Sequence, residues 1–478
     1  MSKKKYDLIV IGSGAGMNVA SSAHSMGMKV AVLDNGPIGG TCLNRGCIPT
    51  KIILYPAEIA TTIREGGKIG VHADNVTIDF DLVMKRMHDL IDGDVEQMEK
   101  GVKAAEGLDF YNSTGRFLDP HTIEVEGKRI KAPLILIAAG SREFIPPIKN
   151  IEETGYLTST TALELKKPPK SLIIVGGGYI AAEMGHFFEA VGTRVTIVGR
   201  NKYLVPQEET EISEELKSRL SMRMKVHTGT EALEAGTDEK GKYIIARDRK
   251  KNKKYRIHAK EIMLAVGRIS NADLFDAEAA GIETDDKGWV IVDKHMRTNV
   301  DHIWAIGDAI GRNLFRHTAN YESEVAWNNM MAESEDEMEE LDEHAVPHSV
   351  FTHPEISSVG MTEAEAVKKH IVMVGEAKYT DAVKGYAMGE DSSFVKVIVS
   401  AKTRRILGAH AIGPHATAMV QPLVYLMNAG KGTFIPLARA QTVHPALEEV
   451  MVNAFGNMRP GRGQEKHFQH THSHAHHH

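Results

Sequence analysis

The chain of 478 residues contains only two cysteines, Cys42 and Cys47, both within the stretch GGTCLNRGCIPTK. A disulfide is a two-electron acceptor, and it forms only where the two Cα atoms lie within about 7 Å of each other. If a helix begins near Cys42, the span to Cys47 covers about one and a half turns and allows the sulfurs to meet. A helix N-terminus and nearby cations also lower the pKa of a thiol. The spacing therefore predicts a redox-active pair rather than two unrelated buried cysteines.

A strand–turn–helix–strand unit precedes the two cysteines. The segment Tyr6–Gly12 is predicted to be a strand, further glycines follow at Gly14 and Gly16, and a second strand ends at Asp34. In such a unit, backbone N–H groups at the start of the helix bind a pyrophosphate, and the acid binds a ribose. The segment therefore predicts a Rossmann-like dinucleotide site.

The same arrangement returns in the stretch SLIIVGGGYIAAEMGHFFEAVGTRVTIVGR. Gly176, Gly177 and Gly178 follow its first strand, and its second strand ends at Arg200. One glycine motif alone is a weak signal, whereas two complete units predict two bound dinucleotides. A nicotinamide and a flavin would then form an electron path that ends on the cysteine pair.

Composition limits the other functions open to the chain. The net charge is −6, the apolar share is 42% and the charged share is 25%, a balance typical of globular proteins. It provides no electrostatic footprint for nucleic acid, and no apolar run reaches the length of a membrane-spanning helix. Two cysteines make no secreted-type disulfide framework, so the expected location is the cytoplasm. We expect no nucleic-acid or membrane partner and no metal site.

The stretch GGTCLNRGCIPTK resembles the active-site segment of the flavoprotein disulfide reductases. The segments ILIAAGSR, LAVGR, IWAIGD and HPALEEV extend this resemblance over about residues 5–456. The resemblance implies FAD and NADPH, or NADH, as cofactors and a small disulfide as the substrate. It also implies a homodimer whose active site is shared across the interface.

The expected fold class is α/β, with two Rossmann-like dinucleotide-binding domains and a C-terminal α+β dimerisation domain. The expected boundaries are 1–148 for the first part of the FAD-binding domain, 149–267 for the NAD(P)H-binding domain, 268–344 for the second, central part of the FAD-binding domain, 345–458 for the dimerisation domain and 459–478 for a disordered His-rich tail.

The resemblance implies a role for each residue of the redox site. Cys42 would exchange with the substrate disulfide, and Cys47 would lie against the flavin as the charge-transfer thiol. Lys51 would lie near flavin N5 and pair with Glu183, which belongs to the helix of the second dinucleotide unit.

The segment HPALEEV supplies the expected acid–base pair. His444 would be the general base and Glu449 would orient its imidazole. A thiol with a pKa of about 8.5 is mostly protonated at neutral pH, so a histidine titrating near pH 7 both generates the attacking thiolate and protonates the leaving one. In this family the histidine reaches the disulfide of the other subunit. His317, His348 and His353 are expected to be ordinary surface or core residues.

The second unit indicates which nicotinamide dinucleotide binds. Its second strand ends in TIVGRNK, where Gly199 supplies no acid for a ribose 2′-hydroxyl and Arg200 and Lys202 suit a 2′-phosphate. Tyr179 resembles the tyrosine that gates the flavin in NADPH-dependent members. The alternative is that Arg200 is a plain surface cation. The residues expected to bind the cofactors are Gly12, Gly14, Gly16, Asp34, Thr41, Lys51, Gly140, Gly176, Gly178, Tyr179, Ile180, Arg200, Lys202, Gly267, Arg268 and Asp308.

The substrate remains open between two kinds of disulfide reductase. The segments GSGAGMN, GYIAAE and GRISNADLFDAEAAGI resemble the mycothione reductase branch, which indicates an NADPH-dependent reductase of a low-molecular-weight disulfide. The alternative is a dihydrolipoamide dehydrogenase, and a third hypothesis is a non-catalytic flavin-binding protein. Arg45, between the two cysteines, would either attract a carboxylate on the substrate or face solvent.

Overall fold

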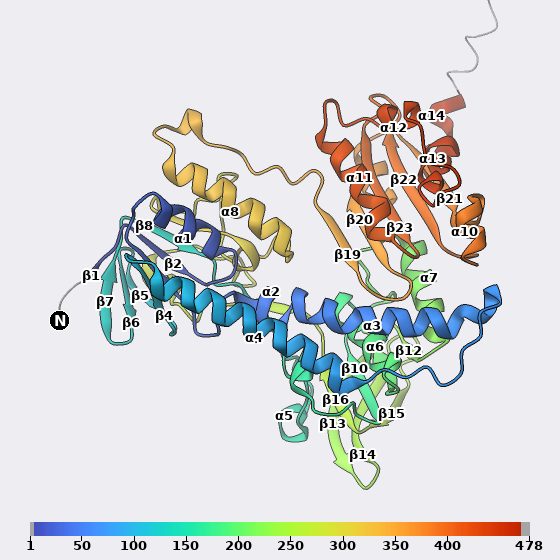
Figure 1. Cartoon of the computed structure of the whole chain (residues 1–478), viewed down its shortest axis with the longest axis horizontal. Helices are drawn as coiled ribbons and strands as arrows, with labels where there is room; N and C mark the ends of the chain where they lie inside the picture. The colour runs from blue at the N-terminus through green and yellow to red at the C-terminus, as the bar shows by residue number, and fades with distance from the viewer. Residues whose placement is uncertain (1–3, 470–478) are drawn as a thin grey trace, which may run out of the picture.

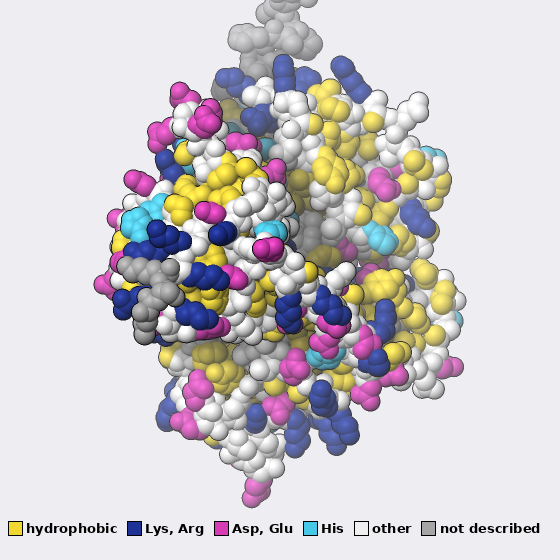
Figure 2. Space-filling model, turned by 60° about the vertical axis from the view of Figure 1, so that its left-hand side comes forward, with side chains coloured by type: hydrophobic (Ala, Val, Ile, Leu, Met, Phe, Trp, Pro, Cys, Tyr) yellow, Lys and Arg dark blue, Asp and Glu magenta, His cyan; other side chains and the backbone are white. Residues whose placement is uncertain are grey.

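The computed structural model describes residues 4–469. In Figure 1 the N-terminal sheet with α1 and α8 lies at one side, the second dinucleotide unit lies below α3 and α4, and the C-terminal domain lies above them. On the face shown in Figure 2, basic and acidic side chains are interspersed.

The first dinucleotide unit is built on a five-stranded parallel sheet. Its order is β18 (Ile303–Ala305), β8 (Leu134–Ile137), β2 (Leu8–Ile11), β3 (Val30–Leu33) and β4 (Leu108–Tyr111). The strands β2 and β3 are apolar and buried along their whole length because helices cover both faces of such a sheet. Since β18 comes from a later part of the chain, this unit is assembled from two separate segments.

The second unit is inserted between those segments. Its parallel sheet has the order β12 (Lys225–His227), β11 (Arg194–Val198), β10 (Ser171–Val175) and β16 (Glu261–Leu264). The helix α6 (Tyr179–Ala190) connects β10 to β11. The chain leaves the first unit through β9 (Ser141–Glu143) and returns through β17 (Arg268–Ser270), and these two strands pair with each other.

Two long helices join the units. The helix α3 (Cys47–Glu65) and the helix α4 (Phe80–Ala104) share one apolar core with α6. Phe80 of α4 stacks on Phe187 of α6, with ring centroids 6.1 Å apart. The helix α3 therefore brings residues 39–51, which contain the two cysteines, against the second dinucleotide unit. We call residues 39–51 the redox stretch.

The C-terminal domain is an α+β structure, as the sequence predicts. Its antiparallel sheet has the order β19 (Pro347–Val350), β20 (Ile356–Gly360), β23 (Ile406–Ile412), β22 (Phe394–Ser400), β21 (Val372–Lys378) and β24 (Met458–Pro460). The helices α11 (Ala416–Asn428) and α13 (Glu449–Gly456) pack on this sheet through the apolar core of the domain.

The expectation of a disordered tail from residue 459 is wrong for residues 459–469. The strand β24 adds to the edge of the sheet, and Gln464 is buried. The Gln464 amide accepts from the Val372 N–H and donates to the carbonyls of Val367 and His370. Such bonds satisfy backbone groups that α9 (Glu363–Lys369) and β21 leave unpaired. The remaining part of the tail lies outside the described residues.

A buried ion cluster ties the C-terminal domain to the second unit. Along β22, Val395, Val397 and Val399 belong to the core beneath α11 and α13, so the alternating residue Lys396 faces the opposite side. The Lys396 side chain is fully buried, 3.0 Å from Glu209 and 2.8 Å from Glu363. Glu209 immediately precedes α7 (Thr210–Ser221), so the pairing crosses between the two domains.

Replacing Lys396 with Met should lower the free energy of unfolding by about 3–5 kcal/mol, because Glu209 and Glu363 would lose their central cation while buried. Urea unfolding followed by circular dichroism measures this. Exposed Lys402 provides the matched control Lys402→Met, and equal midpoints for the two variants would contradict the prediction.

The effect of Lys396→Met should also depend on pH. Burial raises the pKa of Glu363, but bonding to Lys396 and to the Arg462 N–H outweighs burial, and the net pKa is lowered. A carboxyl whose pKa is lowered on folding contributes stability above its unfolded pKa and loses that contribution as pH falls through the folded pKa. The difference between Lys396→Met and the unmodified protein should therefore shrink in acid.

Candidate active site

The two cysteines lie on either side of a break between two helices. The helix α2 (Gly40–Arg45) contains Cys42, and Cys47 is the first residue of α3. At Gly46 a Cβ atom would lie only 2.9 Å from the Thr41 carbonyl oxygen, so a glycine allows α3 to start against α2. The two thiols are in contact across this break, whereas the spacing predicted that helical turns starting near Cys42 would bring them together.

The contact between the two thiols and the cations around them eases loss of the first proton. Contact with the Cys47 thiol lowers the pKa of Cys42, burial opposes this, and the charges of Arg316 and Lys51 add to the lowering, giving a pKa of about 7. The pKa of Cys47 is raised by its contact with Cys42. Because the two thiols titrate together, the first proton lost belongs to the pair. The expected charge-transfer role of Cys47 stays a prediction.

Lys51 makes an ion pair with Glu183, as the resemblance implies. The Lys51 Nζ lies 3.0 Å from both carboxylate oxygens of Glu183, and the Glu183 side chain is only 10% exposed. Glu183 also accepts from the Phe351 N–H at 3.0 Å, and Lys51 lies 4.4 Å from the centre of the Phe351 ring. The redox stretch, α6 and the start of the C-terminal domain therefore meet at one carboxylate.

The N-terminal glycine turn fits a pyrophosphate. Gly12 has a φ of +107°, and a Cβ there would lie 2.1 Å from the Ala138 carbonyl oxygen, so only glycine lets β2 turn so close to β8. At the start of α1 (Gly16–Ser25) the N–H groups of Gly14 and Ala15 have no acceptor among residues 4–469. Unpaired N–H groups at a helix start are donors for a phosphate anion.

One cavity connects this turn to the other expected cofactor residues. Its lining includes the expected residues Gly12, Gly14, Asp34, Thr41, Gly140 and Asp308 together with Cys42 and Cys47. Asp308 accepts from the Ser141 hydroxyl at 2.6 Å and lies 3.6 Å from Arg268. Asp34 accepts from the Ser13 N–H at 2.7 Å. The donors and acids along this cavity fit the dinucleotide FAD, with the two cysteines at one part of its wall.

The second glycine turn has the same backbone constraint. Gly176 has a φ of +141°, and a Cβ there would lie 2.1 Å from the Ala265 carbonyl oxygen. Gly178 precedes Tyr179 and Ile180 at the start of α6. Arg200 and Lys202 are exposed just beyond β11, where the sequence places them.

Tyr179 is held by partners that the sequence did not indicate. Its hydroxyl donates to Glu208 at 2.9 Å, and Glu208 also pairs with His348 at 2.7 Å. The Tyr179 ring stacks against Phe315 and His348. His317 and His353 likewise have partners, the Pro347 carbonyl and Glu65, so the three histidines are satisfied residues as expected.

Arg45 is half-exposed and lines the dinucleotide cavity together with Cys42 and Cys47. Its attraction for a substrate carboxylate stays a prediction. A Cβ on Gly36 would lie 3.4 Å from the Arg45 guanidinium and 3.6 Å from Asp34. Because Arg45 lies in the last turn of the short helix α2, its side chain reaches the end of β3.

His444 and Glu449 form the expected pair. The His444 Nδ1 lies 2.8 Å from a Glu449 oxygen, and the other oxygen accepts from the Ala446 N–H. Bonding to His444 lowers the pKa of Glu449. The His444 side chain is 70% exposed, and within residues 4–469 of one chain it makes no hydrogen bond or ion pair with Cys42 or Cys47.

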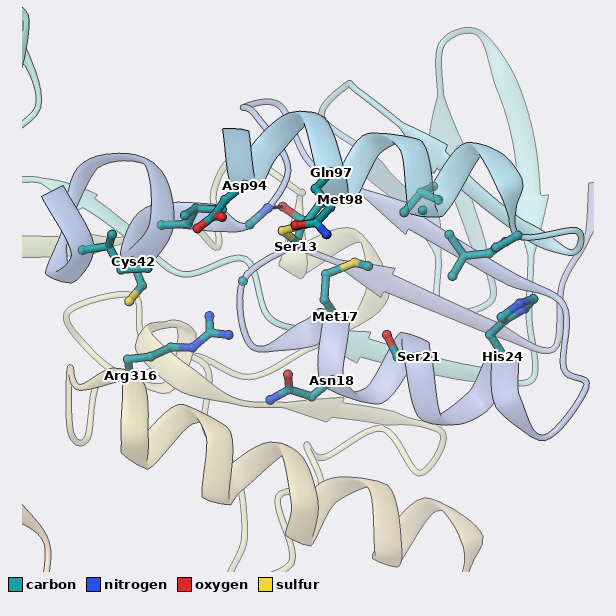
Figure 3. Close-up of a pocket in the computed structure, with 18 of the residues that line it drawn as sticks. Ser13, Met17, Asn18, Ser21, His24, Cys42, Asp94, Gln97, Met98 and Arg316 are labelled. Atoms are coloured by element: carbon teal, nitrogen blue, oxygen red, sulfur yellow. Dashed lines mark hydrogen bonds between the residues drawn. The ribbon is translucent and has the colours of Figure 1, made fainter. Parts of the chain in front are cut away.

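A second cavity, of about 740 Å³, opens on the other side of Cys42. It runs between α1 and α4, as Figure 3 shows. Its polar lining includes Asn18, Ser21, His24, Asp94, Gln97 and Arg316. We call it the α1–α4 groove. Sequence reasoning missed Arg316, although a cation at the start of the helix that follows the Asp308 motif was a signal available in the sequence.

Two family models match the chain. The model of the pyridine nucleotide-disulphide oxidoreductases matches residues 6–328, and that of their dimerisation domain matches residues 346–455. The fold and site thus define a flavin- and nicotinamide-dependent oxidoreductase. The chain belongs to the pyridine nucleotide-disulphide oxidoreductase family, whose members are enzymes that use FAD and NAD(P)H.

Individual relatives cover nearly the whole chain. Mycothione reductase of Mycobacterium tuberculosis is 35% identical, and the match covers 95% of this chain and 99% of the relative. A dihydrolipoyl dehydrogenase of Bacillus subtilis is 32% identical, with 92% and 95% covered. The solved structure of the HOCl-induced flavoprotein disulfide reductase RclA from Escherichia coli aligns with a TM-score of 0.83 at 26% identity, covering 94% of this chain and 99% of that chain.

Two further features bear on the site. Among the described residues, no three or more His, Cys, Asp or Glu side chains are grouped so as to hold a metal ion. Within that same part of the chain, every helix is too short or too polar to cross a membrane.

Proposed function

We propose that this protein is an NADPH-dependent reductase of a low-molecular-weight disulfide, similar in activity to mycothione reductase, acting as a homodimer in the cytoplasm. One observation carries the proposal: Cys42 lines both the dinucleotide cavity and the open α1–α4 groove, whereas Cys47 lines the dinucleotide cavity. Electrons that enter on the cavity side can therefore reach a substrate in the groove through Cys42. The absence of an acid at Gly199 and the exposure of Arg200 support NADPH over NADH.

FAD, when bound, supplies the chemistry that takes up hydride from the nicotinamide and passes an electron pair to the disulfide. The bound FAD would be held by Lys51, Asp34 and Asp308. Reduction breaks the Cys42–Cys47 bond and leaves one thiol and one thiolate. The Cys42 thiolate then attacks one substrate sulfur, forms a mixed disulfide and releases the first substrate thiolate.

His444 of the partner subunit would complete the proton transfers. Its imidazolium protonates the first leaving thiolate, and the resulting neutral imidazole accepts the Cys47 proton. The Cys47 thiolate attacks the Cys42 sulfur, which restores the protein disulfide and releases the second thiolate. That thiolate takes the proton from His444, and solvent protonates the imidazole again, so one disulfide consumes one NADPH and one proton.

The exposure of the C-terminal domain supports the shared site. His444 is exposed, and so are large apolar side chains of the same domain: Tyr386 by 74%, Tyr425 by 66% and Val443 by 76%. A dimerisation domain is present in the sequence. A partner subunit that covers these side chains would bring its own His444 to the α1–α4 groove.

Dihydrolipoamide dehydrogenase stays the second candidate, because those relatives match nearly the same length of chain. A substrate panel separates the two. Each substrate would be assayed with NADH and with NADPH. The panel contains lipoamide, glutathione disulfide, mycothione, bis-γ-glutamylcystine and coenzyme A disulfide. We expect the highest kcat/KM with NADPH and mycothione. Preference for lipoamide with NADH would favour the second candidate, and no turnover with any disulfide would favour a non-catalytic flavoprotein.

Replacing Arg200 with Glu should raise KM for NADPH and improve the use of NADH. A charge-assisted contact with a phosphate contributes roughly 1.5–3 kcal/mol, so we expect a change of about 10- to 100-fold in relative kcat/KM. Lys225→Glu, at an exposed lysine of β12, is the control. A protein that prefers NADH before any substitution would contradict the assignment.

His444→Gln should leave flavin reduction by NADPH nearly intact, since that half-reaction uses groups of one chain. Turnover of disulfide should fall by about 100- to 10,000-fold, the usual contribution of a positioned acid–base group. Mixed dimers of Cys42→Ser chains and His444→Gln chains should regain about a quarter of full activity, because half the dimers are mixed and each carries one intact site. If subunit exchange is verified by mass but activity stays absent, the site lies within one chain.

A further inference from the structure

Arg316 carries an unpaired positive charge where the two cavities meet. It is the first residue of α8 (Arg316–Met331) and is half-buried. It lines both the dinucleotide cavity and the α1–α4 groove, and so does Cys42. Its guanidinium makes no hydrogen bond or ion pair with any residue in the described range 4–469. Figure 3 shows the Arg316 side chain extending into the groove beside the Cys42 sulfur.

An unpaired guanidinium in this position can attract an anion in either cavity. Arginine is charged at any pH that the protein experiences, and partial burial strengthens its field because less water screens it. The neighbouring cation Arg312, by contrast, donates a hydrogen bond to the Val292 carbonyl and forms an ion pair with Glu343. The free charge of Arg316 is therefore available to a group in the cavities.

Several charged groups surround Cys42. Cys47 and Lys51 approach from α3 and Arg316 from α8. Asp94 of α4 lines the α1–α4 groove, and Arg45 of α2 lines the dinucleotide cavity.

The two cations that act on Cys42 are not equivalent. Lys51 is paired with the buried carboxylate of Glu183 at 3.0 Å, so the pair has little net charge. Arg316 has no such counter-charge. Its charge acts on Cys42, whereas Lys51 acts on Cys42 and Cys47 alike. Arg316 also lines the α1–α4 groove together with Cys42, whereas Cys47 does not line that groove.

We propose that Arg316 stabilises the thiolate of Cys42, so that the attacking thiolate forms within one chain before any histidine of a partner subunit takes part. When Cys42 ionises, its proton goes to solvent and the negative sulfur faces the guanidinium. Arg316 cannot donate or accept a proton at neutral pH, so it does not replace His444 in protonating the leaving thiolate. The inference goes beyond the proposed function because it holds for any disulfide substrate.

The test measures the reactivity of Cys42 directly. The flavin-loaded protein would be reduced with dithiothreitol, desalted without oxygen, and alkylated with iodoacetamide between about pH 5 and 10, since only the thiolate reacts. Trypsin cleaves after Arg45 and so places Cys42 and Cys47 on different peptides. Mass spectrometry then gives a separate rate–pH profile for each cysteine.

Arg316→Leu should shift the alkylation midpoint of Cys42 upward by about one pH unit, which slows alkylation about 10-fold below the midpoint. Arg316→Lys keeps the charge and should stay near the unmodified profile. Arg312→Leu, which removes the paired cation four residues earlier in the loop before α8, should leave the Cys42 profile unchanged.

An unchanged Cys42 midpoint in Arg316→Leu would overturn the proposal. So would an equal shift in Arg316→Lys, because the side chain would then act through its shape. If Arg316→Leu does not retain flavin absorbance, Arg316→Gln gives the same comparison with a polar chain of similar length. The assay contains no disulfide substrate and no nicotinamide, so an error in the proposed substrate or cofactor preference would not change its result.

Discussion

The ion pair between Lys51 and Glu183 fixes the relation between the redox stretch and the second dinucleotide unit. Lys51 lies one turn into α3, the helix that begins at Cys47, so the pair that holds Lys51 also holds that sulfur. Glu183 is nearly buried, and loss of either partner would leave a charge in a poorly solvated place. The Phe351 N–H holds the same carboxylate from the C-terminal domain. One contact therefore aligns three parts of the chain around the thiols.

The backbone constraints of the site were readable from the sequence because they are local. Gly12 and Gly176 must be glycines since each turns against a neighbouring carbonyl with a positive φ, and such turns have a recognisable pattern. The pairing of His444 with Glu449 was implied by the resemblance of HPALEEV to the family motif. The parallel sheets follow from the alternation of strands and helices.

Features that depend on packing between distant parts of the chain could not be predicted from the sequence. Residues 459–469 look polar and loop-like, yet Gln464 satisfies backbone groups almost one hundred positions earlier in the chain. Arg45 turns toward Asp34 because of the direction of the short helix α2, which no residue pattern encodes. Arg316 lies far from Cys42 in sequence, and only the assembled first unit places both beside one groove.

The first dinucleotide unit is completed by a strand made late in synthesis. The strand β8 ends at Ile137, but its neighbour β18 begins at Ile303, after the whole inserted unit. At a ribosomal speed of about 5–20 residues per second, the wait is roughly 10–30 s. Throughout that interval β8 is an uncovered sheet edge, which is a template for pairing with another nascent chain. A circular permutation that places β18 next to β8 in sequence would shorten the time for which the β8 edge is uncovered. It should therefore reduce aggregation during expression.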